Sequence, residues 1–119
     1  MAIEIEEEEP KKVYYVGSCE KDINKFPTDV ADDIASAIDM VAHGEEPDDF
    51  KPMKSVGAGV YEIREKDGDT WYRVFYVAKL GDTVYVLHAF RKNQNKTPPN
   101  EIKTGQQRYK LAAQMAAGK

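Results

Sequence analysis

The chain has 119 residues, of which 41% are hydrophobic and 32% are charged, and its formal net charge is −4. This length suits one domain, and no apolar run approaches the ~18 residues that span a membrane, so we expect a soluble, single-domain protein. The single cysteine excludes an internal disulfide, and with only two histidines the composition argues against a metal site built from thiolates or imidazoles.

The two halves of the chain carry opposite charge. Residues 1–50 contain four Lys or Arg against fifteen Asp or Glu, whereas residues 51–119 contain thirteen against six. This asymmetry favours a polyanion or an acidic partner for the second half.

The N-terminal segment is predicted to be a tail. Residues 6–9 are four consecutive glutamates before Pro10, and their mutual repulsion without core-forming residues favours disorder. The segment also lacks the basic and apolar regions of a signal peptide, so we expect a cytoplasmic protein. Residues 1–12 are therefore interpreted as an acidic, disordered tail, and residues 13–116 as the folded domain.

The first half of this domain reads as one strand and two helices. Residues 13–16 are β-branched or aromatic and predict a strand, and residues 19–25 allow two helical turns that Pro27 would end. Thr28 then offers a capping hydroxyl to a second helix that closes at Gly44. Its apolar residues recur at helical spacing: Val30, Ile34, Ile38 and Val41. Residues 45–59 show no period and are predicted to be a loop.

The second half reads as a meander followed by a helix. Strands are predicted at residues 60–65, 70–78 and 83–90, because tight-turn residues with Gly68 and Gly81 separate them. A loop over residues 91–98 leads to a helix that begins near Pro99. The order β-α-α-β-β-β-α predicts a single two-layer α+β domain with a mainly antiparallel sheet.

Alternation along the strands predicts a functional sheet face. Arg73 shares its face with Trp71 and Phe75, and Arg64 and His88 join them if the register allows. On the last strand, the same alternation groups Val84, Val86, His88 and Phe90. Guanidinium groups beside aromatic rings suit a nucleic-acid strand.

Simpler interpretations stand beside this one. Arg73 could pair with Glu62, His88 could be a structural histidine, and residues 91–96 could be a solvated loop. Cys19 is expected to be a small buried residue, because the sequence offers it no obvious base as a nucleophile.

Four segments in this order and spacing carry a family resemblance: YEIR (61–64), WYRVFY (71–76), LHAFRK (87–92) and KTP (96–98). Together they resemble the phage-derived HigB-like branch of the RelE/ParE toxin superfamily, over about residues 11–113. Members of that family are toxins of type II toxin–antitoxin pairs, and most are endoribonucleases that cut mRNA in the ribosomal decoding site. The element order predicted above agrees with the RelE-like fold.

The resemblance implies roles for individual residues. Arg73 matches the arginine that holds the scissile phosphate, and His88 matches a histidine that would take the proton of the ribose 2′-hydroxyl. Arg64 and Lys92 would complete the catalytic set by stabilising charge. The residues expected to bind RNA are Lys54, Trp71, Arg91 and Lys96. Such cleavage requires no metal, so no cofactor is expected.

The same resemblance implies partners and leaves alternatives open. The partners would be the ribosome, mRNA and a cognate antitoxin, and the expected antitoxin is a helix-turn-helix DNA-binding protein. No membrane would be involved. Two features depart from the family: the chain is acidic overall, and Glu62 adds a negative charge to the active strand. A toxin that inhibits by binding protein, as the ParE branch does with DNA gyrase, and an inactive antitoxin-binding module remain alternatives, because fold alone does not decide function.

Overall fold

The computed structural model describes residues 9–92 and 96–118. Its elements are, in chain order, β1 (Lys12–Tyr15), α1 (Cys19–Asn24), α2 (Thr28–Ala42), β2 (Phe50–Pro52), β3 (Val60–Asp67), β4 (Thr70–Val77), β5 (Thr83–Lys92) and α3 (Pro99–Ala117). The predicted α+β class and the order of the predicted elements are confirmed. Most of the predicted acidic tail falls on residues 1–8, which lie outside the described residues.

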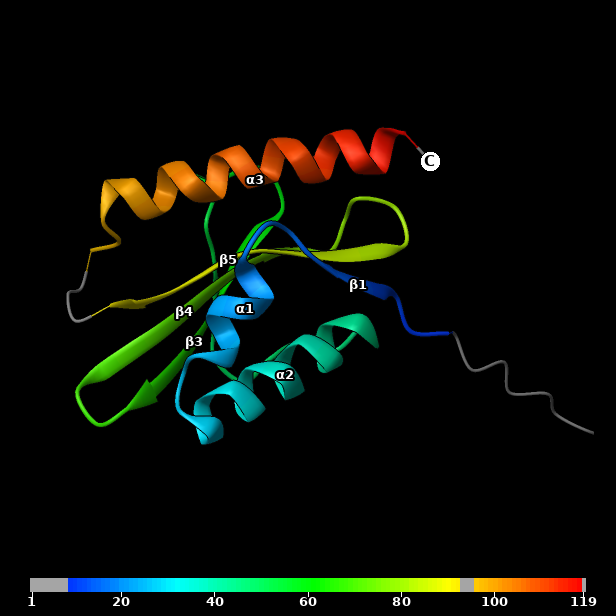
Figure 1. The fold of residues 1–119 in the computed structure, drawn as a ribbon. Helices are drawn as coiled ribbons and strands as arrows, with labels where there is room; N and C mark the ends of the chain where they lie inside the picture. The colour runs from blue at the N-terminus through cyan, green and yellow to red at the C-terminus, as the bar shows by residue number, and fades with distance from the viewer. Residues whose placement is uncertain (1–8, 93–95, 119) are drawn as a thin grey trace, which may run out of the picture.

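The strands form one sheet in the order β1-β5-β4-β3-β2 (Figure 1). The pairs β2–β3, β3–β4 and β4–β5 are antiparallel, and β1 joins β5 in parallel. Both predicted hairpins are confirmed. Each turn contains a glycine in the left-handed region, Gly68 at φ 61° and Gly81 at φ 71°, a conformation in which a side chain would be strained.

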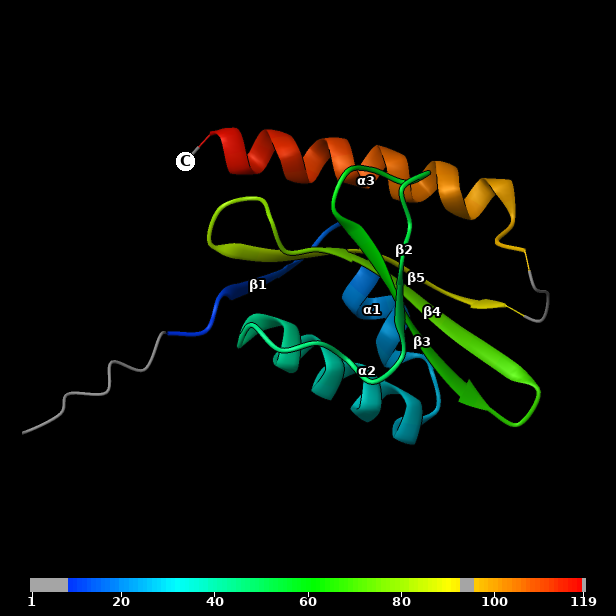
Figure 2. The same ribbon diagram turned by 180° about the vertical axis from the view of Figure 1, so that it is seen from behind.

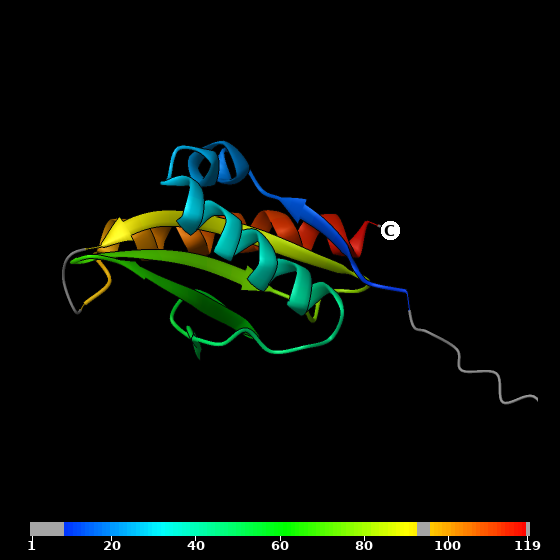
Figure 3. The ribbon, with the colours of Figure 1, turned by 90° about the horizontal axis from the view of Figure 1, so that it is seen from below.

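Helices cover both faces of the sheet. Alternate β4 residues Tyr72, Val74 and Tyr76 pack with α1 and α2, while Phe75 and Val77 pack toward α3. Figure 1 shows α3 above the sheet and α2 below it, and in Figure 3 α2 lies in front of the sheet, α1 lies beside its β5 strand and α3 lies behind. The expected two layers are therefore three, because α3 buries the face that α1 and α2 leave open.

Two local expectations for the first half need correction. Thr28 is the first residue of α2 and Pro27 occupies the capping position, with no side-chain cap bond. Residues 50–52, predicted to lie in a loop, form the edge strand β2, in which Lys51 faces Glu62 of β3 (Figure 2). Three residues that end in proline carry no detectable strand pattern, and only pairing with β3 orders them.

A β-bulge changes the predicted grouping on β5. Phe75 pairs with His88 and Tyr76 pairs with Val86, so Leu87 is an extra residue. Val84 and Val86 consequently face α1 and α2, whereas Phe90 belongs to the α3 side and stacks with His88. The prediction that these four residues share one face is therefore wrong.

The remaining expectations concern burial. Cys19 is fully buried, as predicted, and burial raises the pKa of its thiol to about 12, which suppresses thiolate chemistry. No helix in the described part of the chain is long and apolar enough to cross a membrane.

Candidate functional site

The register of β3, β4 and β5 brings cations together on the α3 side of the sheet. Arg64 pairs with Arg73, Lys66 pairs with Trp71, and Trp71 pairs with Lys92 on its other side. Lys51 of β2 extends the same side, because it faces Glu62. We call this surface the cation face, and its members are Lys51, Arg64, Lys66, Trp71, Arg73 and Lys92. The sequence-based grouping of Arg64, Arg73, Trp71 and Phe75 is confirmed by this register.

At the base of the cation face, Arg73 forms a buried ion pair with Glu62. The Arg73 Nη1 atom donates to Glu62 Oε1 over 2.6 Å, and the two residues are 4% and 0% exposed. The Lys51 ammonium lies 3.8 Å from the same oxygen. Glu62 Oε2 and Arg73 Nε have no partner among the described residues, so this pair retains unused hydrogen-bonding capacity in a dry environment.

Trp71 is surrounded by three of these cations. The Cζ atom of Arg64, the Nζ atom of Lys66 and the Cζ atom of Arg73 lie 5.7, 5.3 and 5.1 Å from the centroid of the Trp71 ring. These distances are within the range of cation–π attraction. Arg64 also reaches Asp49, with its Nη2 atom 2.7 Å from Oδ1. Its side chain remains 32% exposed, so it is accessible to a ligand.

Lys92 is the most buried lysine of the cation face. It is 3% exposed, and its ammonium donates to the Thr97 hydroxyl over 3.1 Å. Burial, followed by repulsion from Arg73, lowers the pKa of Lys92 below the ordinary lysine value. A lysine of this kind is more readily neutral than a surface lysine and can exchange a proton with a substrate.

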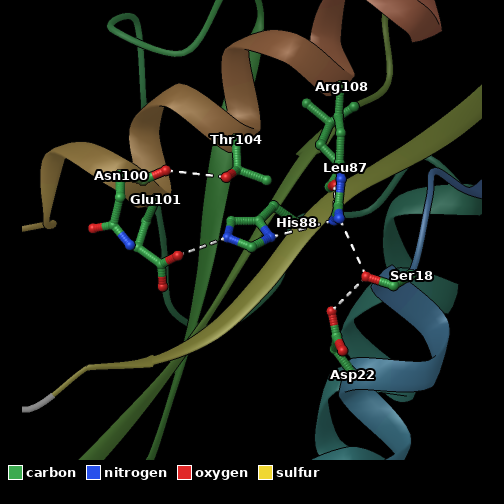
Figure 4. Close-up of polar contacts among 8 residues, drawn as sticks. All are labelled: Ser18, Asp22, Leu87, His88, Asn100, Glu101, Thr104 and Arg108. Carbon is green, nitrogen blue, oxygen red and sulfur yellow. Dashed lines mark hydrogen bonds and ion pairs between the residues drawn. The ribbon is translucent and has the colours of Figure 1, made fainter.

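His88 occupies the same side of the sheet but joins a separate network with α3 (Figure 4). Its Nε2 atom lies 3.0 Å from Glu101 Oε1, and its Nδ1 atom lies 3.3 Å from Arg108 Nη1. Because arginine can only donate, Nδ1 accepts and the Nε2 proton is donated to Glu101. Burial lowers the pKa of His88, against an opposing contribution from Glu101. The lone pair that a general base would use is therefore occupied by Arg108.

The network continues from Arg108 to α1. Its Nη1 atom also donates to the Leu87 carbonyl over 3.1 Å, and its Nη2 atom donates to the Ser18 hydroxyl over 3.2 Å. Ser18 in turn donates to Asp22 over 2.9 Å. Glu101 and Arg108 were not predicted as partners of His88. Their seven-residue spacing, which places both on one side of a helix, was the available signal.

Three residues predicted to bind RNA lie outside the cation face. Lys54 is exposed in the loop between β2 and β3, and Lys96 is exposed before α3. Arg91 pairs with Tyr72, so it lies on the opposite side of the sheet from Lys92. In the described residues no group of three or more His, Cys, Asp or Glu is arranged to hold a metal ion.

Comparison with protein families gives one match. A family model described as phage derived protein Gp49-like (DUF891) matches residues 21–110, which include α1 from its third residue, α2, all of β2 to β5 and the first part of α3. Comparison with curated proteins gives no match. The matched span includes every residue of the cation face and the His88 network from Asp22 to Arg108.

Proposed function

We propose that this protein is the toxin of a type II toxin–antitoxin pair, and that the toxin binds and cleaves RNA. The family model covers residues 21–110, so the chain belongs to the Gp49-like family of phage-derived proteins, which is associated with RelE-like toxins. Its partners under this proposal are a cognate antitoxin of the helix-turn-helix type, the ribosome and mRNA. It acts without a cofactor in the cytoplasm.

The observation that carries this proposal is the composition of the cation face. The face holds five cations and one tryptophan, whose ring three of the cations approach, against the two carboxylates of Asp49 and Glu62. A surface with excess positive charge attracts the phosphate backbone, and an aromatic ring beside it offers a base a stacking partner.

The proposed chemistry divides these residues by exposure. Lys51 and Arg64 are partly exposed, 39% and 32%, and bind phosphate oxygens. Arg73 is paired with Glu62 and contacts the Trp71 ring, so it positions that ring and adds to the local positive potential. Lys92, whose pKa is lowered, accepts the proton of the ribose 2′-hydroxyl, so that the 2′-oxygen attacks phosphorus. The bond from phosphorus to the 5′-oxygen breaks, that oxygen takes a proton from water as it leaves, and a 2′,3′-cyclic phosphate remains on the preceding ribose.

The test compares two substitutions on the cation face with one outside it. Arg64→Ala should weaken RNA binding and reduce its salt dependence, because a phosphate contact is lost. Lys92→Met keeps the length of a buried side chain but cannot accept a proton, so it should abolish single-turnover cleavage while RNA still binds. Lys21→Ala, at an exposed position on α1, is the matched control and should change neither. Mapping new RNA 5′-ends in induced cells extends the test to mRNA on ribosomes.

A toxin that inhibits by binding a protein is the second candidate, and the state of His88 favours it. Both imidazole nitrogens are engaged, by Glu101 and Arg108, so this histidine offers no free base, and Arg73 is paired and buried. Growth inhibition without new RNA ends, lost in Arg64→Ala but retained in Lys92→Met, would establish this candidate and refute cleavage.

A further inference from the structure

A polar cavity of about 720 Å³ lies on the side of the sheet opposite the cation face. It opens between the α1–α2 corner and strands β4 and β5. Its polar and aromatic lining comes from Asp22, Lys25, Phe26, Thr28, Tyr72 and Arg91. This volume is typical of pockets that bind small molecules.

Tyr72 is the first indication of a ligand. The residue is 4% exposed, and its ring packs on Phe26 with 4.7 Å between the centroids. No other described residue hydrogen-bonds to its hydroxyl, and the side chain lines the cavity. The hydroxyl is not among the buried atoms that lack a partner, so it opens into the cavity and can donate to an acceptor atom of a ligand there.

The charges of the cavity define what this acceptor is. Lys25 and Arg91 both line it, and neither forms an ion pair with any described residue. Thr28, the first residue of α2, adds a hydroxyl at the positive end of a 15-residue helix. Two cations and two hydroxyl donors fit a phosphate group, because arginine and lysine form charge-assisted hydrogen bonds with its oxygens.

The remaining lining residues fit a nucleoside. Asp22 is the carboxylate of the lining, and Ser18 donates to only one of its oxygens, so the other can accept a hydrogen bond from a ribose hydroxyl. Phe26 is partly buried and offers the rest of its ring to a base. Phosphate, ribose and base thus each have a matching group within one cavity.

We propose that this cavity binds a ribonucleoside monophosphate, with the phosphate at Lys25, Arg91 and Tyr72 and the ribose at Asp22. The ligand is a free nucleotide or the phosphorylated 5′-end of an RNA chain, since both present the same chemistry. This site is separate from the cation face and does not depend on RNA cleavage there.

Isothermal titration of the full chain with AMP, adenosine and inorganic phosphate tests the proposal at physiological ionic strength. AMP should bind at least tenfold more tightly than either fragment, because it engages both ends of the cavity. Arg91→Ala should weaken AMP binding at least tenfold, and Tyr72→Phe should weaken it severalfold while it keeps the ring packed on Phe26. Lys21→Ala is the control and should bind as the wild type does. Equal affinity for AMP and adenosine, or an unchanged affinity in both cavity variants, would overturn the proposal.

Two further measurements separate the ligand sources and the two faces. Short RNA with a 5′-phosphate should displace AMP more effectively than the same RNA with a 5′-hydroxyl if the ligand is an RNA end, and the two should be equivalent if it is a free nucleotide. The single tryptophan of the chain, Trp71, lies on the cation face, so AMP should leave its fluorescence unchanged whereas RNA bound at the cation face should quench it. AMP binding that quenches Trp71 and survives Arg91→Ala would place the ligand on the wrong face and refute the assignment.

Discussion

Replacing Arg73 with methionine tests whether this arginine holds the fold together or is reserved for a ligand. Methionine keeps a long apolar side chain and removes the guanidinium group. The change leaves Glu62, which is 0% exposed, with Lys51 as its remaining cation at 3.8 Å. That lysine is 39% exposed, so water screens its attraction for the carboxylate.

The expected loss in the free energy of unfolding is about 3 kcal/mol. Removing one partner of a buried ion pair typically costs about 3–5 kcal/mol, because the other charge is left uncompensated. The residual contact with Lys51 places the loss at the lower end of this range. A domain of this kind has roughly 5–15 kcal/mol of stability, so the variant should still fold at 25 °C but lose a large share of it.

Urea unfolding monitored by far-UV circular dichroism measures this loss. For a urea dependence of about 1.5 kcal/mol per M, the midpoint should fall by about 2 M. The double variant Glu62→Leu, Arg73→Met should recover most of the loss, because an apolar pair of similar volume replaces both charges. This recovery distinguishes a broken ion pair from general damage to packing.

The reasoning is refuted if Arg73→Met unfolds within about 1 kcal/mol of the wild type. Glu62 would then not depend on Arg73, and the arginine would be available to a phosphate. In that event the folded variant should lose RNA binding, whereas a purely structural arginine predicts that residual binding follows the folded fraction.

Three other predictions use the same unfolding assays and chemical labelling. Burial lowers the pKa of His88, so below about pH 6.5 the unfolded chain binds a proton that the folded protein does not. The free energy of unfolding should therefore fall as the pH drops from 6.5 toward that lowered pKa. His88→Gln, compared with the wild type at pH 7.5 and 5.5, should remove this part of the decrease. An unchanged pH dependence would show that His88 does not contribute. Gly105→Ala should destabilise the protein by about 1–3 kcal/mol despite a better helix propensity, because the new Cβ would lie 2.8 Å from Phe75 Cδ2; a raised thermal midpoint would contradict this. Cys19, whose pKa is raised to about 12, should react with a thiol reagent only after unfolding, and rapid labelling of the native protein would disprove its burial.

Local chemistry accounts for what the sequence alone predicts about this protein. Helix α2 follows from apolar residues at helical spacing, and both hairpins follow from turn glycines that take a positive φ. The pairing of Arg64 with Arg73 depends on the short turn at Gly68, because a tight turn sets the register of its two strands. These features depend on residues a few positions apart, so their signals are present in a single stretch of chain.

Tertiary contacts decide the rest, because they join residues that no local pattern connects. The bulge at Leu87 appears only when β5 pairs with β4, and it is this extra residue that turns His88 and Phe90 away from the face of Val84 and Val86. His88 acquires its partners only when α3 packs on the opposite face, where Phe90 also lies, and both imidazole nitrogens are hydrogen-bonded there. The sequence offers Glu62 as a partner for Arg73, but the burial of that pair follows from how the strands lie in one sheet, since burial at each position is set by neighbours far away in the chain.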